Sequence, residues 1–124
     1  MVTPSAGIVV TVQFPFSDLS RSKLRPAVVL ASAGRADWIL CQVTSNAYAD
    51  QEAVQLESSD FASGSLSLTS YARPGKLFTA NTSLMATEVG KLKDAAFRRV
   101  ATAVVGLLQS HIPIEEASSS ETEE

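Results

Sequence analysis

Apolar and polar positions alternate along much of this chain with the period of two that β-strands require, most clearly over residues 8–14. Pro15 ends that predicted strand because proline has no N–H to donate to a neighbouring strand. The run Val28-Val29-Leu30 indicates a strand that is buried on both faces. The strands predicted in this way span residues 8–14, 27–32, 38–44, 53–56, 67–72, 76–80 and 89–92.

Turn-forming residues separate these strands, and the periodicity changes to a helical one near the C-terminus. Residues 14–24 and 58–65 predict loops, and Arg73-Pro74-Gly75 predicts a turn. Asp94 is predicted to cap a helix that Ile112-Pro113 stops. The predicted apolar face of this helix comprises Phe97, Val100, Ala101, Val104, Leu107 and Leu108. Short strands followed by one packing helix predict a mainly β fold, a strongly bent barrel or half-barrel with the helix covering an open side.

The length of 124 residues fits one domain, which we expect to span residues 1–113. Residues 114–124 are dominated by Glu and Ser and predict an acidic, disordered tail. We expect no membrane span, because no run of about 20 apolar residues occurs, and no secretory signal, because the N-terminus lacks its pattern. A single cysteine, Cys41, suits a reducing cytoplasm. One cysteine and one histidine argue against a zinc site built by the protein.

Although the net charge of the whole chain is −3, the chain without its last ten residues is slightly basic. Five of the 13 acidic residues lie in the last ten positions, and without them ten Lys and Arg residues face eight acids. Arg21, Lys23 and Arg25 form one basic cluster, and Arg73 with Lys76 forms a second. Such patches fit a polyanionic ligand, although basic clusters are more often solvated surface.

Four polar side chains stand where predicted strands begin or end. Arg25 precedes the second strand, Thr44 and Ser45 end the third, and Arg73 lies at the predicted turn. If these strands share one sheet, their ends converge and present guanidinium groups and hydroxyls to one anion, for which bidentate arginine is well suited. In the structural alternative, Arg25 pairs with a carboxylate while Thr44 and Ser45 satisfy backbone groups of a turn.

Three segments in order, residues 14–30, 39–45 and 71–79, resemble the MazF/PemK-like toxins of type II toxin–antitoxin modules. Residues 83–85 and 89–92 extend the resemblance, which covers roughly positions 6–110. It implies an SH3-like β-barrel with a C-terminal packing helix, a homodimer, and a cognate antitoxin as inhibitor. It also implies an endoribonuclease that cleaves single-stranded RNA without metal or cofactor, the ribose 2′-OH attacking the adjacent phosphate to leave a cyclic phosphate and a 5′-OH.

The resemblance also implies roles for individual residues. Arg25 corresponds to the cation that stabilises the phosphate and is a candidate acid, while Thr44 and Ser45 correspond to hydrogen-bond partners of the scissile phosphate. Arg73 matches a position that supplies a second catalytic cation in some members. The side chains expected to contact RNA are Phe16, by stacking, together with Asp18, Lys23 and Lys76.

The sequence departs from the family pattern at two positions. Ile8 follows Gly7 where members usually have Asp, and Gly75 stands where some members have a carboxylate. The general base is therefore unassigned, and Asp18, which is also a common turn former, is one candidate. Two alternatives stay open: a non-catalytic toxin that binds a protein such as DNA gyrase, and a decayed toxin that retains antitoxin binding.

Overall fold

A computed structural model describes residues 2–15, 22–47 and 49–115 of the chain. Its elements are β1 (Ile8–Pro15), β2 (Ser22–Gly34), β3 (Asp37–Thr44), β4 (Val54–Leu56), the 3-10 turn η1 (Ser58–Asp60), β5 (Phe61–Gly64), β6 (Ser70–Asn81), the 3-10 turn η2 (Thr82–Leu84), β7 (Met85–Leu92) and α1 (Asp94–Gln109). The described residues thus confirm the predicted mainly β fold with one C-terminal helix.

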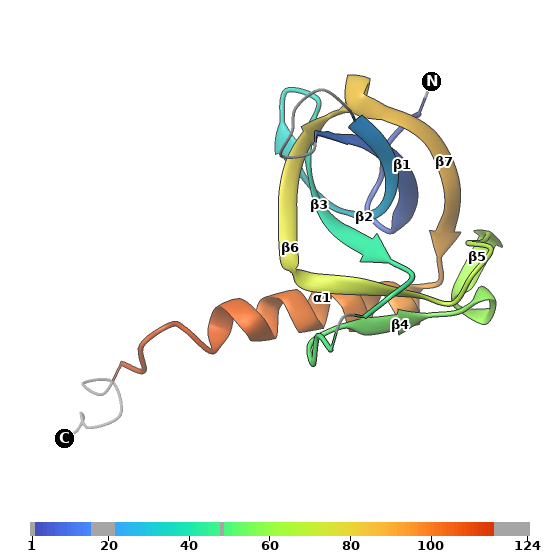
Figure 1. Cartoon of the computed structure of the whole chain (residues 1–124). Helices are drawn as coiled ribbons and strands as arrows, with labels where there is room; N and C mark the ends of the chain where they lie inside the picture. Colours follow the sequence, from blue (N-terminus) through green and yellow to red (C-terminus); the bar gives the residue numbers. More distant parts are fainter. Residues whose placement is uncertain (1, 16–21, 48, 116–124) are drawn as a thin grey trace.

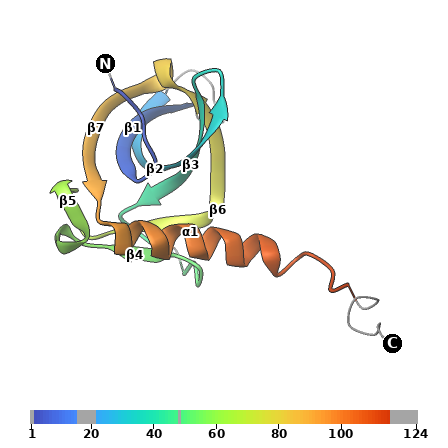
Figure 2. The ribbon, with the colours of Figure 1, turned by 180° about the vertical axis from the view of Figure 1, so that it is seen from behind.

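The strands form one seven-stranded sheet in the order β4-β6-β3-β2-β1-β7-β5, with every neighbouring pair antiparallel. The sheet curls strongly, so that β7 and β6 lie on opposite sides of an open barrel (Figure 1). Helix α1 crosses below the curled strands, as the view from behind also shows (Figure 2). This arrangement is the bent barrel that the sequence predicts.

The central strands contribute buried side chains to two core clusters, one on each face of the sheet. One strand can supply both clusters because its successive side chains point in opposite directions. In β1, Val9 belongs to one core cluster and Val10 to the other. In β2, Val28 and Val29 are divided in the same way, which confirms the predicted two-sided burial. The first cluster includes residues of α1, whereas the second holds no described helix residue. The helix therefore covers one face of the central strands.

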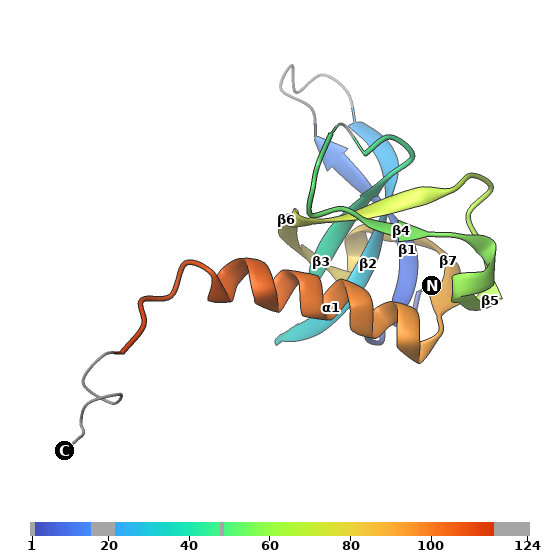
Figure 3. The same cartoon turned by 90° about the horizontal axis from the view of Figure 1, so that it is seen from below.

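Helix α1 packs through Ala96, Val100 and Val104, which are buried against the first cluster or beside it. The predicted cap is wrong: Asp94 is the first helical residue, and Lys93 precedes it without a side-chain capping bond. The Asp94 carboxylate still lies in the first turn, where the helix dipole favours negative charge. Figure 3 shows α1 lying across β2 and β3.

The predicted turn at Arg73-Pro74-Gly75 is also wrong, since β6 continues through these residues. Strand β3 pairs with β6 on both sides of them, Cys41 with Leu77 and Val43 with Ala72. The extra residues of β6 are accommodated by a shift in register between these pairs. Proline is tolerated at such a bulge because no ladder hydrogen bond is required of it there.

Long-range pairing also moved other predicted boundaries. Part of the segment expected to be a loop at residues 58–65 is strand β5, which pairs with β7. The two backbones approach closely at Gly64, where φ is +64° and a Cβ atom would collide with the carbonyl of Val89. Strand β2 begins earlier than predicted, at Ser22, and β7 begins at Met85. The predicted disorder of the tail beyond Glu115 concerns residues outside those described.

Candidate functional site

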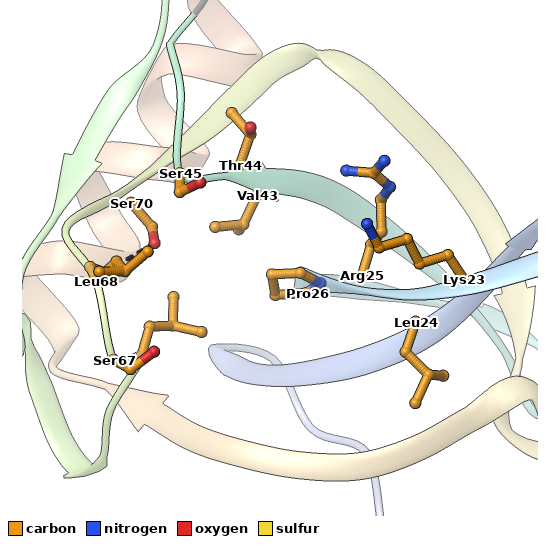
Figure 4. Close-up of a pocket in the computed structure, with 11 residues that line it drawn as sticks. Lys23, Leu24, Arg25, Pro26, Val43, Thr44, Ser45, Ser67, Leu68 and Ser70 are labelled. Carbon is orange, nitrogen blue, oxygen red and sulfur yellow. Dashed lines mark hydrogen bonds between the residues drawn. The ribbon is translucent and has the colours of Figure 1, made fainter.

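A cavity of about 300 Å³ opens where β2 begins and β3 ends. Its walls come from the first part of β2, which supplies two cations, from the polar end of β3, and from the segment that leads into β6. It is lined by Lys23, Leu24, Arg25, Pro26, Val43, Thr44, Ser45, Leu66, Ser67, Leu68 and Ser70. Figure 4 shows Arg25 and Lys23 on one side of this cavity, with Ser45, Ser67 and Ser70 on the other.

The register of the sheet explains why Arg25 and Thr44 meet. Strands β2 and β3 are antiparallel, and Ala27 pairs with Gln42. Continuing this register by two residues places Arg25 opposite Thr44. Because side chains alternate along a strand, Arg25 also shares a face with Ala27, and Thr44 shares one with Gln42. A guanidinium and a hydroxyl are thus presented at the same end of the strand pair.

The lining of the cavity is electropositive. Lys23 is exposed and Arg25 is half-buried, so both cations are reachable from solvent. The lining contains neither a carboxylate nor an imidazole among the described residues. Two cations beside several hydroxyl donors form a site suited to an anion such as a phosphodiester.

Thr44 is nearly enclosed, with 7% of the residue exposed, yet it lines the cavity. Its Oγ1 accepts the backbone N–H of Asn46 at 3.2 Å. The alternative prediction, that this hydroxyl accepts a backbone N–H of a turn, is thus confirmed for Thr44. The same bond leaves the Thr44 hydroxyl proton available for donation to a ligand, because an oxygen that accepts one hydrogen bond can still donate. Ser45, the next residue, is exposed.

Arg73 and Lys76 do not line this cavity. They line a second cleft of about 460 Å³, together with Ala49, Asp50, Gln51, Glu52, Gly75 and Leu107. The Nε of Arg73 donates to Oδ2 of Asp50 at 2.9 Å, and the two side chains are 21% and 15% exposed. The expected convergence is therefore correct for Arg25, Thr44 and Ser45, whereas Arg73 is directed to a carboxylate elsewhere.

Two pKa values near this second cleft are shifted by their surroundings. The hydrogen bond from Arg73 is the main cause that lowers the pKa of the Asp50 carboxyl, and the backbone N–H of Glu52 contributes in the same direction. Burial raises the pKa of the Cys41 thiol to about 12, although a backbone hydrogen bond at Arg73 acts in the opposite direction. Cys41 is thus a buried apolar residue, as its place in the strand predicts.

Phe16 and Asp18, which were expected to contact RNA, lie outside the described residues. The sequence did not single out Ser67, which precedes β6, or Ser70, which begins it, because isolated serines carry no chemical signal of their own. Nor did it single out Asp50, since nothing in the spacing links this residue to Arg73.

Within the described ranges, no group of three His, Cys, Asp or Glu side chains is arranged to hold a metal ion. Across the same ranges, no helix has the length and apolar character that a membrane crossing requires.

A family model described as "PemK-like, MazF-like toxin of type II toxin-antitoxin system" matches residues 5–108 of the chain. No curated protein sequence matches the chain.

Solved structures share the fold at low sequence identity. One is an endoribonuclease in complex with its cognate antitoxin from a Mycobacterial species, with 18% identity, a TM-score of 0.66, and coverage of 93% of this chain and 100% of that chain. A MazE–MazF crystal structure from Deinococcus radiodurans has 23% identity and a TM-score of 0.69, over 88% of this chain and 98% of that one. The Mycobacterium tuberculosis toxin MazF-mt6 has 14% identity and a TM-score of 0.64, over 82% of this chain and 96% of that one.

Proposed function

Since the chain belongs to the PemK-like, MazF-like toxins of type II toxin–antitoxin systems, we propose that it is an endoribonuclease that cleaves single-stranded RNA. The observation that carries this proposal is the cavity in which Arg25 and Lys23 share a lining with Thr44 and Ser45. Two structural neighbours of the same fold, both endoribonucleases from Mycobacterial species, support it.

The proposed reaction is an intramolecular transesterification in which the 5′-oxygen is the leaving group. The ribose 2′-oxygen forms a bond to the adjacent phosphorus and loses its proton, while the bond from phosphorus to the 5′-oxygen breaks and that oxygen gains a proton. The products are a cyclic phosphate and a 5′-OH. The reaction needs no metal ion as written, because the protein supplies the positive charge.

Each residue has a role that its chemistry permits. The guanidinium of Arg25 carries a positive charge, so it stabilises the negative charge that gathers on the phosphate oxygens. Thr44 and Ser45 donate hydrogen bonds to the same phosphate, and Lys23 attracts the neighbouring phosphate of the strand. Removal of one such donor typically costs about 10²–10³ in kcat.

The described lining residues of the cavity supply no general base for the 2′-OH, because none of them is a carboxylate. We keep Asp18 as the candidate base, because it is the only carboxylate in the sequence of the first loop, residues 14–24. Phe16 is proposed to stack on a base of the RNA. Arg73 and Lys76 do not contact the scissile phosphate in this proposal, since they line the other cleft.

We also propose that the chain forms a homodimer in the cytoplasm and is inhibited by a cognate antitoxin. Exposed apolar side chains on β6 and α1 support association with another chain: Leu77, Val105 and Leu108 are 37%, 56% and 57% exposed. Light scattering of the purified toxin would give its mass in solution. An antitoxin segment rich in acidic residues would complement the basic cavity.

The decisive test incubates the purified chain with a kilobase-length RNA transcript in the presence of EDTA and maps the new 5′ ends. We expect cuts at a defined sequence that leave 5′-OH ends, and we expect Arg25→Ala to abolish them. Arg98→Ala is the matched control, because it removes an exposed arginine of α1 away from the cavity. If the wild type leaves RNA intact but arrests growth and inhibits DNA gyrase, the protein-binding alternative replaces this proposal.

A further inference from the structure

The segment that follows Thr44 must cross over strand β6. Strands β3 and β4 are both antiparallel to β6 and lie on opposite sides of it, so that Ala72 pairs with Val43 on one side and with Val54 on the other. The chain between β3 and β4 therefore passes from one side of β6 to the other. We refer to residues 45–47 and 49–53 as the crossover segment.

Asp50 is the residue through which the crossover segment is held. Its side chain accepts the Nε of Arg73 at 2.9 Å, and Arg73 directly follows Ala72 in β6. Its other carboxylate oxygen accepts the N–H of Glu52 at 2.9 Å, and its own N–H donates to the carbonyl of Ala47 at 2.8 Å. One carboxylate thus joins the segment to itself and to the strand beneath it.

The same segment carries the hydroxyls of the cavity at its start. Ser45 lines the cavity, and the N–H of Asn46 is bonded to Oγ1 of Thr44. Asn46 is adjacent to Ala47, which accepts the N–H of Asp50. A continuous series of covalent and hydrogen bonds therefore leads from Arg73 to the Thr44 hydroxyl.

We propose that Arg73 is a positioning residue for RNA cleavage: through Asp50 it holds the crossover segment over β6, so that Thr44 and Ser45 face the phosphate site. This inference rests on the proposed endoribonuclease activity. It gives Arg73 a different role from that of a second cation on the phosphate, because its side chain lines another cleft and is engaged by a carboxylate.

Kinetics with a short oligonucleotide that carries the mapped cut site, labelled with a fluorophore and a quencher, distinguish the two roles. We expect Arg73→Ala and Asp50→Ala each to lower kcat by roughly 10–100-fold with little change in KM, because misplacement of about 1 Å can cost this much. The charge-exchanged double variant, Arg73→Asp with Asp50→Arg, should recover kcat to within about tenfold of the wild type, since an ion pair is restored.

A catalytic cation would behave differently. If Arg73 contacts the phosphate, Asp50→Ala retains wild-type kcat and the charge-exchanged variant is as inactive as Arg73→Ala; either result overturns the proposal. Wild-type kcat in both single variants also overturns it. Arg99→Ala is the matched control, because it breaks the ion pair between Arg99 and Asp60 (3.2 Å), which does not involve the crossover segment. Its kcat should equal that of the wild type.

Amide hydrogen exchange provides a readout without RNA. In Arg73→Ala, the N–H groups of Asp50, Glu52 and Ala53 should exchange faster than in the wild type, while those of β1 stay protected. Unchanged exchange in the crossover segment would overturn the inference even if activity falls.

A wild type that cleaves no RNA would defeat the proposed function, whereas faster exchange in the variant would still show that Arg73 holds the segment. Arg73→Lys and Asp50→Asn replace the alanine variants if those do not fold.

Discussion

Arg25 of β2 and Thr44 of β3 line the same cavity, and the register of the two antiparallel strands sets them at the same level. The guanidinium is half-buried and the hydroxyl is almost enclosed, so a bound phosphate would lose much of its water while gaining both partners. Electrostatic contacts are stronger in such a site than in bulk water. Substitution of either side chain therefore tests its contribution separately.

Arg25→Lys should retain RNA binding but lose most of the cleavage rate. A lysine keeps the positive charge, whereas it cannot offer the two parallel N–H donors with which arginine grips a phosphate. We expect kcat to fall about 10–100-fold, less than for Arg25→Ala, with the dissociation constant for uncleavable RNA changed about threefold or less. Single-turnover cleavage and fluorescence anisotropy measure the two quantities. Equal kcat for the lysine variant and the wild type would contradict a bidentate role.

Thr44→Val should impair catalysis and destabilise the protein slightly. Valine has the same shape but lacks the oxygen that accepts the Asn46 N–H, so the free energy of unfolding should fall by about 1 kcal/mol. We expect kcat to fall about 10²–10³-fold because a phosphate donor is lost. Thr82→Val is the control, since its hydroxyl donates to the carbonyl of Ala36 at 3.0 Å, far along the sheet from the cavity. It should lower stability no more than Thr44→Val does, and its kcat should equal that of the wild type.

The ion pair of Asp50 with Arg73 predicts a pH dependence of stability. Arg73 lowers the pKa of Asp50 in the folded state, so the pair stabilises the protein above the unfolded-state pKa of about 3.9. This contribution is lost as the pH falls from that value through the lower folded-state pKa. Urea unfolding of the wild type and Asp50→Asn should therefore differ most near neutral pH and converge in acid. A difference that stays constant across this range would contradict the assignment.

Cys41 should be inert in the folded protein. Burial raises the pKa of its thiol to about 12, and the thiolate is the reactive form. We expect labelling by a disulfide reagent at pH 8 to be at least about a hundredfold slower in buffer than in denaturing urea. Rapid labelling without denaturant would show that the sheet opens locally near β3.

Leu40→Ala should destabilise the second core cluster, which contains no described residue of α1. Leu40 is fully buried in this cluster, and its truncation leaves a cavity that costs about 2–5 kcal/mol. Leu84→Ala is the matched control, because that leucine is 47% exposed and should change stability by less than about 1 kcal/mol. Chemical unfolding followed by circular dichroism measures both variants.

The sequence determined the local elements whose pattern is strong. The alternation of residues 8–14 and the double-sided run at Val28-Val29 predicted β1 and the burial of β2 on both faces. Helical spacing predicted α1, and Arg25, Thr44 and Ser45 could be selected because each flanks a strand. Composition could show neither that β5 pairs with β7 nor that β6 continues through Pro74, because both depend on partners distant in the chain.

Only the tertiary structure decided which basic residues line the first cavity and which line the second cleft. Arg25 and Arg73 look equivalent as arginines beside strands, yet one faces a cavity of hydroxyls and the other meets Asp50. The difference arises from the path of the crossover segment, which brings a carboxylate over β6 because β3 and β4 lie on opposite sides of that strand. Side-chain chemistry can be read from the sequence, whereas the partner of each charge depends on how the sheet is connected.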